Sequence, residues 1–229
     1  MNTAIIVAAG SGSRFGSKRP KQFLEILGKP IIQYSLERFS NSPSIDSIVV
    51  VVSADEVENF TKFSHEAGFS KIAGIVAGGE TRASSVLKGL KSVNSECEIV
   101  AVHDAARPLV TVDEINRTID AALRTGAGCL VAPVDDTIKL VEGEMITGTI
   151  DRTNLRRALT PQAFRHSLLK QAFDAVGTGP EVTDECYLVE RLGHPIEQVA
   201  GSPVNIKVTH PADLAVVETF IRNGYLDHV

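Results

Sequence analysis

The chain has 229 residues with a formal net charge of −5, and 43% of the residues are hydrophobic. This length and apolar content suit one compact domain, and the negative charge excludes a general polyanion binder such as a nucleic-acid-binding protein. No apolar run approaches the roughly 20 residues that a membrane helix needs. The three widely spaced cysteines predict buried thiols in a reducing compartment, the cytoplasm.

Strand and helix patterns alternate through the first part of the chain. Continuous β-branched runs, typical of strands buried on both faces, lie at residues 3–9, 47–53, 71–77, 98–104 and 128–134. Helical patterns lie between them, at residues 29–39, 55–68, 81–93 and 111–126. Thr111 and Glu114 have the spacing of a capping box, and Gly126 follows as a helix stop. This alternation predicts a Rossmann-like α/β fold with a mostly parallel twisted sheet and helices on both faces.

The alternation changes at residues 135–152, where two short strand-like pieces flank the turn "EGE". We expect this segment to form a protruding β-hairpin arm. A two-stranded arm is marginally stable alone, so it must lie on its own domain or on a partner subunit. The remaining elements are expected to be helices at 165–176 and 183–192, strands near 195–200 and at 204–209, and a closing helix from Pro211. Since no linker or repeat divides the chain, residues 1–229 are expected to form a single domain that carries the arm.

Glycines and cations are concentrated directly after the first predicted strand, in the stretch "AAGSGSRFGSKRPKQF" (8–23). The glycines let backbone N–H groups approach an anion, and Arg14 and Lys21 add positive charge. In open α/β sheets, ligands gather at the carboxyl ends of strands, where this stretch lies. A Walker A loop needs a glycine, four residues and then Gly-Lys-Ser/Thr, which this stretch does not contain. A dinucleotide fingerprint is excluded because Phe15 stands where its third glycine is needed. The stretch therefore predicts a phosphate-binding loop, with a solvated surface turn as the alternative.

Further motifs accompany this stretch, in the order "GGETRASSVLKGL" (78–90), "VHDAARP" (102–108), "VDDTIK" (134–139), "TIDR" (149–152), "LTPQAF" (159–164), "TDE" (183–185) and "NIKVT" (205–209). Together they resemble the 2-C-methyl-D-erythritol 4-phosphate cytidylyltransferase family of sugar-nucleotide-type nucleotidyltransferases. Each motif alone is weak, but the series spans nearly the whole chain. The resemblance implies transfer of CMP from CTP to 2-C-methyl-D-erythritol 4-phosphate. The products would be 4-diphosphocytidyl-2-C-methyl-D-erythritol, used in non-mevalonate isoprenoid precursor synthesis, and pyrophosphate.

The resemblance implies that four cations carry the chemistry: Arg14, Lys21, Arg152 and Lys207. Arg14 and Lys21 would stabilise the transition state around the triphosphate, and Arg152 and Lys207 would hold the incoming phosphate. The attacking phosphomonoester is largely dianionic at neutral pH because its second pKa is about 6, so no general base is required. Cations are required, because two anions must be brought together and the charge of the transition state must be offset.

By the same resemblance, the nucleotide would be bound by Ala8, Ala9, Gly10, Gly12, Gly78, Gly79, Glu80, Arg82 and Ser85. Gly78 and Gly79 would leave room for a planar base against the backbone. Glu80 and Ser85 would contact the base and ribose regions, and Arg82 would brace the loop. Taken alone, this segment is more typical of an ordinary strand-to-helix turn whose charged side chains are solvated.

The acceptor would be bound by Asp104, Arg107, Thr137 and Thr183. Asp104 is also a candidate ligand for Mg²⁺, although this ion typically keeps waters and would be held mainly by the CTP phosphates. His103 is more typical of a packed histidine than of a catalyst.

In the resembling family the arm reaches across a two-fold dimer, so the resemblance implies a homodimer through residues 135–152. Two other interpretations stay open. Ribitol-5-phosphate cytidylyltransferase shares the fold and uses a related acceptor, although "HDAARP" favours the methylerythritol family. A non-catalytic nucleotide-binding regulatory protein would keep the fold without needing the acceptor-side cations Arg152 and Lys207.

Overall fold

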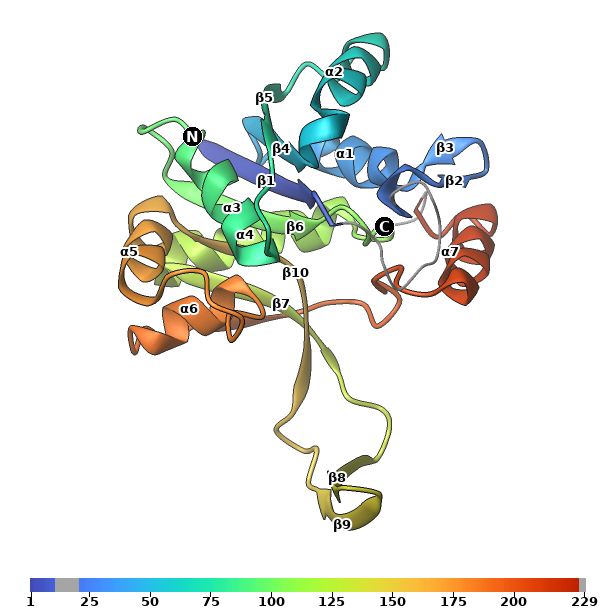
Figure 1. The fold of residues 1–229 in the computed structure, drawn as a ribbon, viewed down its shortest axis with the longest axis vertical. Coiled ribbons are helices and arrows are strands. Elements are labelled where there is room, and N and C mark those ends of the chain that lie inside the picture. Colours follow the sequence, from blue (N-terminus) through green and yellow to red (C-terminus); the bar gives the residue numbers. More distant parts are fainter. Residues whose placement is uncertain (11–20, 227–229) are drawn as a thin grey trace.

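The computed structural model describes residues 1–10 and 21–226, with only the backbone of Lys21. Its centre is a seven-stranded sheet in the order β11-β7-β10-β6-β1-β4-β5 (Figure 1). The strands are β1 (Asn2–Ala8), β4 (Ser47–Val52), β5 (Ile72–Ala77), β6 (Ile99–Asp104), β7 (Ala127–Pro133), β10 (Arg156–Arg165) and β11 (Glu197–Ala200). Only β10 runs antiparallel to its neighbours in this sheet, so the expected mostly parallel α/β sheet is confirmed.

Helices cover both faces of the sheet, and a large hydrophobic core lies on each face. One core contains side chains of α1 (Ile31–Asn41), α2 (Val57–Glu66) and α4 (Val112–Thr125). The other contains side chains of α3 (Arg82–Lys91), α5 (His166–Val176) and α6 (Glu185–Arg191). Since side chains alternate along a strand, neighbouring β1 residues enter different cores, Ile6 the first and Ile5 the second.

The end signals of α4 agree with the sequence. The Thr111 hydroxyl accepts a hydrogen bond from the Glu114 N–H at 3.1 Å, and the Glu114 carboxylate accepts one from the Thr111 N–H at 2.9 Å. Gly126 ends the helix with a φ of 95°, a left-handed conformation that favours glycine. The expected capping box and helix stop are confirmed.

Two elements differ from the prediction. The strand expected at 204–209 is wrong, because residues 203–209 are irregular and lead into α7 (Pro211–Arg222). The apolar pattern there reflects burial of Val208, whose N–H donates to the Ala106 carbonyl at 2.8 Å. Strand β10 was not expected, since its polar residues and Pro161 hide the strand pattern. A small hairpin of β2 (Glu25–Ile26) and β3 (Lys29–Pro30) lies near α7 (Figure 1).

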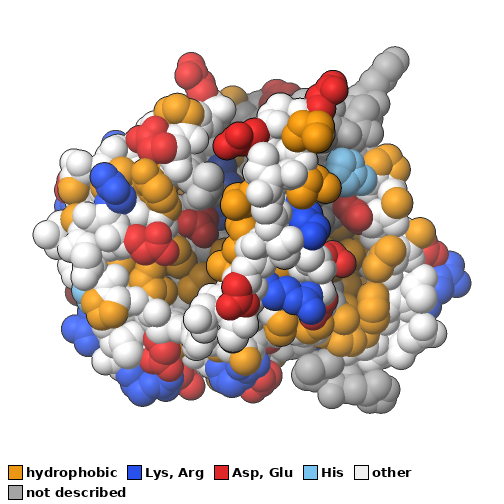
Figure 2. Space-filling view, turned by 90° about the horizontal axis from the view of Figure 1, so that it is seen from below, with side chains coloured by type: hydrophobic (Ala, Val, Ile, Leu, Met, Phe, Trp, Pro, Cys, Tyr) orange, Lys and Arg blue, Asp and Glu red, His pale blue; other side chains and the backbone are white. Residues whose placement is uncertain are grey.

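The expected arm is present as the antiparallel pair β8 (Ile138–Glu142) and β9 (Met145–Ile150). It projects away from the seven-stranded sheet, between the end of β7 and the start of β10 (Figure 1). Four of its apolar side chains are between 51% and 70% exposed: Leu140, Val141, Met145 and Ile146. Figure 2, viewed from the side of the arm, shows hydrophobic side chains on this face of the molecule. Within the described ranges, no helix is both long and apolar enough to cross a membrane.

Candidate active site

The carboxyl ends of β1, β4, β5 and β6 meet at one edge of the sheet. In the parallel register, Ala8 lies opposite Val52, and Val7 lies opposite Asp104. The Gly78 N–H donates to the Val52 carbonyl at 2.7 Å and continues the edge beyond β5. The sheet therefore brings together three predicted groups of residues that are far apart in sequence: Ala8 to Gly10, Gly78 to Ser85, and Asp104.

Gly78 is needed for the close approach of the β1 and β5 ends. A Cβ atom at Gly78 would overlap the Cβ of Ala9 and would lie 2.9 Å from the Ser85 hydroxyl. Any side chain at position 78 would therefore push the two strand ends apart. Glycine, which has no Cβ, allows the two strand ends to approach closely at this point of the predicted nucleotide site.

The segment after Gly78 is a braced turn that leads into α3. The Ser85 hydroxyl accepts from the Gly79 N–H at 3.0 Å and donates to the Thr81 carbonyl at 2.9 Å. Thr81 caps α3 through a capping box with Ser84. Ser85 is buried within this turn, whereas Glu80 is exposed at the edge of the site.

The end of β1 is held by Gln22, a residue to which the sequence assigned no role. Its buried amide donates to the carbonyls of Ala8 and Gly10, the latter at 3.2 Å. Gln22 belongs to the short 3₁₀ helix Lys21–Phe23. The predicted residues Gly12 and Arg14, and the side chain of Lys21, lie outside the described residues.

Asp104 is the centre of a cluster of charged side chains at the end of β6. Its Oδ1 accepts from Arg82 Nε at 2.9 Å, and its Oδ2 accepts from Lys207 Nζ at 2.8 Å. Arg107 Nε lies 3.7 Å from the same Oδ2. Arg82 also binds both carboxylate oxygens of Glu185, at 2.7 and 3.0 Å. The cluster joins residues from four separate segments of the chain.

The surrounding cations fix the charge of Asp104. Burial opposes ionisation, but Arg82, Lys207 and Arg107 together hold the pKa of this carboxyl well below its usual range. Burial also opposes the charge of Arg82, yet Glu185 and Asp104 raise the pKa of this guanidinium. Three cations and two carboxylates leave one net positive charge in the cluster, which suits an anionic ligand.

A chain of hydrogen bonds holds the backbone next to Asp104. Since the Arg107 carbonyl can only accept, His103 Nε2 carries the proton and donates to it at 3.3 Å. His103 Nδ1 then accepts from the Thr160 hydroxyl at 3.1 Å, and that hydroxyl accepts from the Asp104 N–H at 3.1 Å. Burial lowers the pKa of His103 to about 3, so the imidazole is neutral. His103 is a packed histidine, as expected from the sequence.

Arg107 and Lys207 are linked through the irregular segment 203–209. Arg107 donates to the Asn205 carbonyl at 2.8 Å, and the Asn205 amide donates to the Thr160 carbonyl at 3.1 Å. Asn205 is fully buried. The segment that carries Lys207 is therefore fixed against the end of β6 by its neighbours.

Three predicted acceptor residues lie outside this cluster. Thr137 and Arg152 flank the arm strands β8 and β9, and both are exposed. Within residues 21–226, no hydrogen bond or ion pair joins either side chain to the Asp104 cluster. Thr183 is exposed two residues before Glu185, at the start of α6. One chain thus places the arm residues away from the sheet edge.

The carboxylates of the cluster are poorly suited to bind magnesium directly. Both oxygens of Asp104 already accept from cations, and both oxygens of Glu185 accept from Arg82. Among the described side chains, there is no group of three or more His, Cys, Asp or Glu that could hold a metal. Asp104 could coordinate Mg²⁺ only after Arg82 or Lys207 had moved away.

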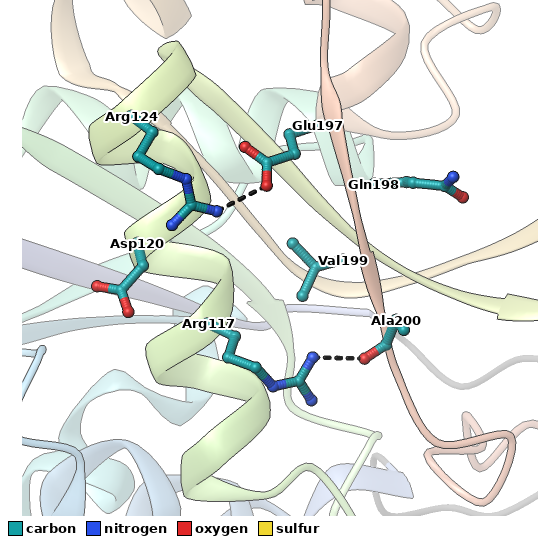
Figure 3. Close-up of a pocket in the computed structure, with 7 residues that line it drawn as sticks. All are labelled: Arg117, Asp120, Arg124, Glu197, Gln198, Val199 and Ala200. Atoms are coloured by element: carbon teal, nitrogen blue, oxygen red, sulfur yellow. Dashed lines mark hydrogen bonds and ion pairs between the residues drawn. The ribbon is translucent and has the colours of Figure 1, made fainter.

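A pocket of about 340 Å³ lies elsewhere, between α4 and the edge strand β11 (Figure 3). Arg124 binds Glu197 at 2.6 Å, and Arg117 donates to the Ala200 carbonyl at 2.7 Å. These contacts tie the helix to the strand, and no predicted site residue lines the pocket. It is separate from the sheet edge described above.

The fold and the cation-rich edge define a Rossmann-like α/β protein of the nucleotide-binding class. A family profile described as IspD, 2-C-methyl-D-erythritol 4-phosphate cytidylyltransferase, matches residues 2–223. The chain belongs to this family, and it is a CTP-dependent nucleotidyltransferase. The resemblance of the sequence motifs to this family is confirmed.

Individual relatives agree with this assignment. A 2-C-methyl-D-erythritol 4-phosphate cytidylyltransferase from Syntrophus aciditrophicus is 43% identical over 223 residues, which cover 96% of this chain and 95% of that protein. A bifunctional enzyme IspD/IspF from Desulfotalea psychrophila is 42% identical over 96% of this chain, which spans 57% of that longer protein.

Solved structures of the family share the fold. The cytidylyltransferase from Francisella tularensis superposes with a TM-score of 0.78 at 33% identity, covering 98% of this chain and 99% of that one. The 4-diphosphocytidyl-2C-methyl-D-erythritol synthase from Anaerococcus prevotii gives a TM-score of 0.85 at 26% identity, covering 96% of both chains. The expected fold class is confirmed by these superpositions.

Proposed function

We propose that the Asp104 cluster receives the phosphate of 2-C-methyl-D-erythritol 4-phosphate, while the β1 end and residues 78–85 hold CTP. The reaction is the CTP-dependent synthesis of 4-diphosphocytidyl-2-C-methyl-D-erythritol in isoprenoid synthesis. The observation that carries the site assignment is the net positive cluster at the sheet edge, directly beside the strand ends that Gly78 allows to meet.

In this arrangement an oxygen of the acceptor phosphate attacks the α-phosphorus of CTP, and pyrophosphate leaves. Lys207 and Arg107 hold the acceptor phosphate, and Arg14 and Lys21 offset charge at the triphosphate. The dianionic phosphate needs no general base. The protein's contribution is to place two anions in line and to compensate their charge.

We propose that Mg²⁺ enters the site on the CTP phosphates, where it would neutralise part of the triphosphate charge. The carboxylates of Asp104 and Glu185 already accept hydrogen bonds from Arg82 and Lys207, which favours this assignment over direct binding of Mg²⁺ by the protein. A cytoplasmic location is also part of the proposal. It is supported by Cys97, Cys129 and Cys186, which are free and buried.

The test is pyrophosphate release by the purified protein with CTP and Mg²⁺. We expect turnover with 2-C-methyl-D-erythritol 4-phosphate and little or none with D-ribitol 5-phosphate. Turnover of ribitol 5-phosphate alone would overturn the proposed acceptor. Binding of CTP without turnover of either polyol phosphate would instead favour a regulatory nucleotide-binding protein.

We further propose a homodimer in which the arm brings Thr137 and Arg152 to the site of the partner subunit. The exposed apolar side chains of the arm support this, since a two-stranded arm gains stability by packing on another surface. The exposure of Arg152, away from the charged cluster of its own chain, also supports it.

Shared sites predict complementation between inactive chains. One chain carries Thr137→Ala and Arg152→Ala, and the other carries Lys21→Ala. In a heterodimer purified through two different tags, one of the two sites has only wild-type residues, so we expect about half of wild-type activity. Each variant assayed alone is the control and should be inactive. Inactive heterodimers would show that the sites are not shared.

A further inference from the structure

Glu185 is a fully buried carboxylate that the catalytic scheme above does not use. Its Oε1 and Oε2 accept from the two terminal nitrogens of Arg82, at 2.7 and 3.0 Å. The third nitrogen of the same guanidinium, Nε, donates to Asp104 Oδ1 at 2.9 Å. Arg82 therefore spans two carboxylates, and Glu185 occupies the outer end of the guanidinium.

This bridge joins the nucleotide side of the site to the acceptor side. Arg82 is the first residue of α3, directly after the turn that begins at Gly78. Asp104 ends β6 and binds Lys207, and Glu185 opens α6 two residues after Thr183. A single guanidinium thus connects three segments that the sequence predicts to contact the two substrates.

The Glu185 side chain is not needed to hold its own helix in place. The Gln162 side-chain carbonyl accepts from the backbone N–H groups of Glu185 and Cys186, at 3.2 and 3.1 Å. The Gln162 amide donates to Asp184, whose carboxylate caps α6 by accepting from the Tyr187 N–H at 2.9 Å. The start of α6 is therefore anchored to β10 without help from the Glu185 carboxylate.

Stability alone is a poor reason for this buried ion pair. Taking a carboxylate and a guanidinium out of water costs several kcal/mol per ion, and apolar replacements of such pairs are often as stable. Burial raises the pKa of Glu185, and Arg82 only limits that rise. A buried pair does fix geometry, because the planar guanidinium binds a carboxylate through two parallel hydrogen bonds.

We propose that Glu185 is a positioning residue for acceptor binding, which acts by holding the outer nitrogens of Arg82. With these nitrogens occupied, Arg82 offers only Nε to Asp104, and the second oxygen of Asp104 stays with Lys207. Without the clamp, the guanidinium can turn and take both oxygens of Asp104. Lys207 then loses the contact that orients it toward the acceptor phosphate. This inference rests on the proposed function.

The test compares Glu185→Gln with Glu190→Gln, which changes an exposed carboxylate on the same helix. Glutamine keeps the size of the side chain and one acceptor for Arg82, and Asp104 still binds this guanidinium, so we expect the fold to be retained. We expect the KM for 2-C-methyl-D-erythritol 4-phosphate to rise about tenfold, which matches the typical free energy of one hydrogen bond to a charged group. The KM for CTP should change less than about threefold. Glu190→Gln makes the same chemical change on the exposed side of α6, so both KM values should stay near wild type.

A second variant separates positioning from a structural role. Arg82→Lys cannot span both carboxylates, so it should raise the acceptor KM to a similar extent. Adding Glu185→Gln to Arg82→Lys should then have little further effect, because both changes remove the same bridge. If Glu185 had only a structural role, Glu185→Gln would lower the melting temperature and the fraction of active enzyme, and the two KM values would not change differently.

Two results would overturn the inference while leaving the proposed function intact. One is an unchanged acceptor KM in Glu185→Gln when the wild-type enzyme is active. The other is an equal rise of both KM values, accompanied by loss of thermal stability. Wild-type protein that releases no pyrophosphate with the methylerythritol acceptor would overturn the proposed function and this inference together.

Discussion

Lys207→Met should lower kcat/KM for the acceptor by about 10²- to 10³-fold, as removing one donor to a developing charge typically does. Among the three cations around Asp104, Lys207 has the most exposed side chain, at 34%, compared with 24% for Arg82 and 12% for Arg107. It is therefore the cation best placed to reach an incoming phosphate. Steady-state pyrophosphate release at varied acceptor concentration measures the effect.

Methionine replaces the apolar stem of lysine with an unbranched apolar chain and lacks only the ammonium group at its end, so this change removes little besides the charge. The segment around Lys207 stays anchored, because Val208 N–H donates to Ala106 and the Asn205 amide donates to Thr160. Asp104 also keeps Arg82 and Arg107 as partners. Lys91→Met, at the exposed end of α3, is the control and should be fully active. A Lys207→Met enzyme within about threefold of wild type would contradict the assigned role.

His103 should make the folded protein sensitive to acid well above the range in which carboxylates are protonated. Its pKa is about 3 in the folded protein, lowered by burial, against about 6.5 in an unfolded chain. A lowered pKa favours the neutral ring, so its contribution to stability is complete above about pH 6.5. The contribution is lost as the pH falls toward 3, by about 1.4 kcal/mol per pH unit.

The measurement is the free energy of unfolding in denaturant, taken at several pH values between about 6.5 and about 4.5. His103→Gln keeps a donor for the Arg107 carbonyl but has no imidazole to protonate. We expect the variant to be less stable at neutral pH and its stability to fall less steeply with acid than that of wild type. His65→Gln changes an exposed histidine and should follow the wild-type curve. Equal slopes for wild type and His103→Gln would show that this ring is not the acid-sensitive group.

Local signals in the sequence were sufficient for much of the fold and for part of the site. Apolar runs predicted five strands of the main sheet, because burial on both faces leaves an uninterrupted pattern. The parallel arrangement then placed Ala9, Gly78 and Asp104 at one edge, since carboxyl ends of parallel strands align. The arm was also predicted, from two short strand patterns around a turn.

The residues that were missed act through partners far away in the chain. Glu185 lies 103 positions from Arg82, and Thr160 lies 57 positions from His103. No local pattern indicates which buried arginine will meet a given glutamate. The wrong strand at 204–209 has a similar cause, because the burial of Val208 within an irregular segment gives the same apolar pattern as a strand. Gln22 lies within the glycine-rich stretch, but its contacts with the Ala8 and Gly10 carbonyls depend on the folded structure and leave no local sequence pattern.

Because β7 pairs with β10, the arm is an insertion whose two ends lie side by side in the sheet. Pro133 and Arg156 are partners in the antiparallel register, so the chain leaves the sheet and returns to it at neighbouring positions. A short turn could connect these two residues without changing any other strand pairing. The length and composition of residues 134–155 can therefore vary during evolution or in engineering without altering the topology of the sheet. Selection on the arm can therefore depend on the surface that the arm contacts outside its own chain, whereas selection on the sheet depends on packing in the cores on its two faces.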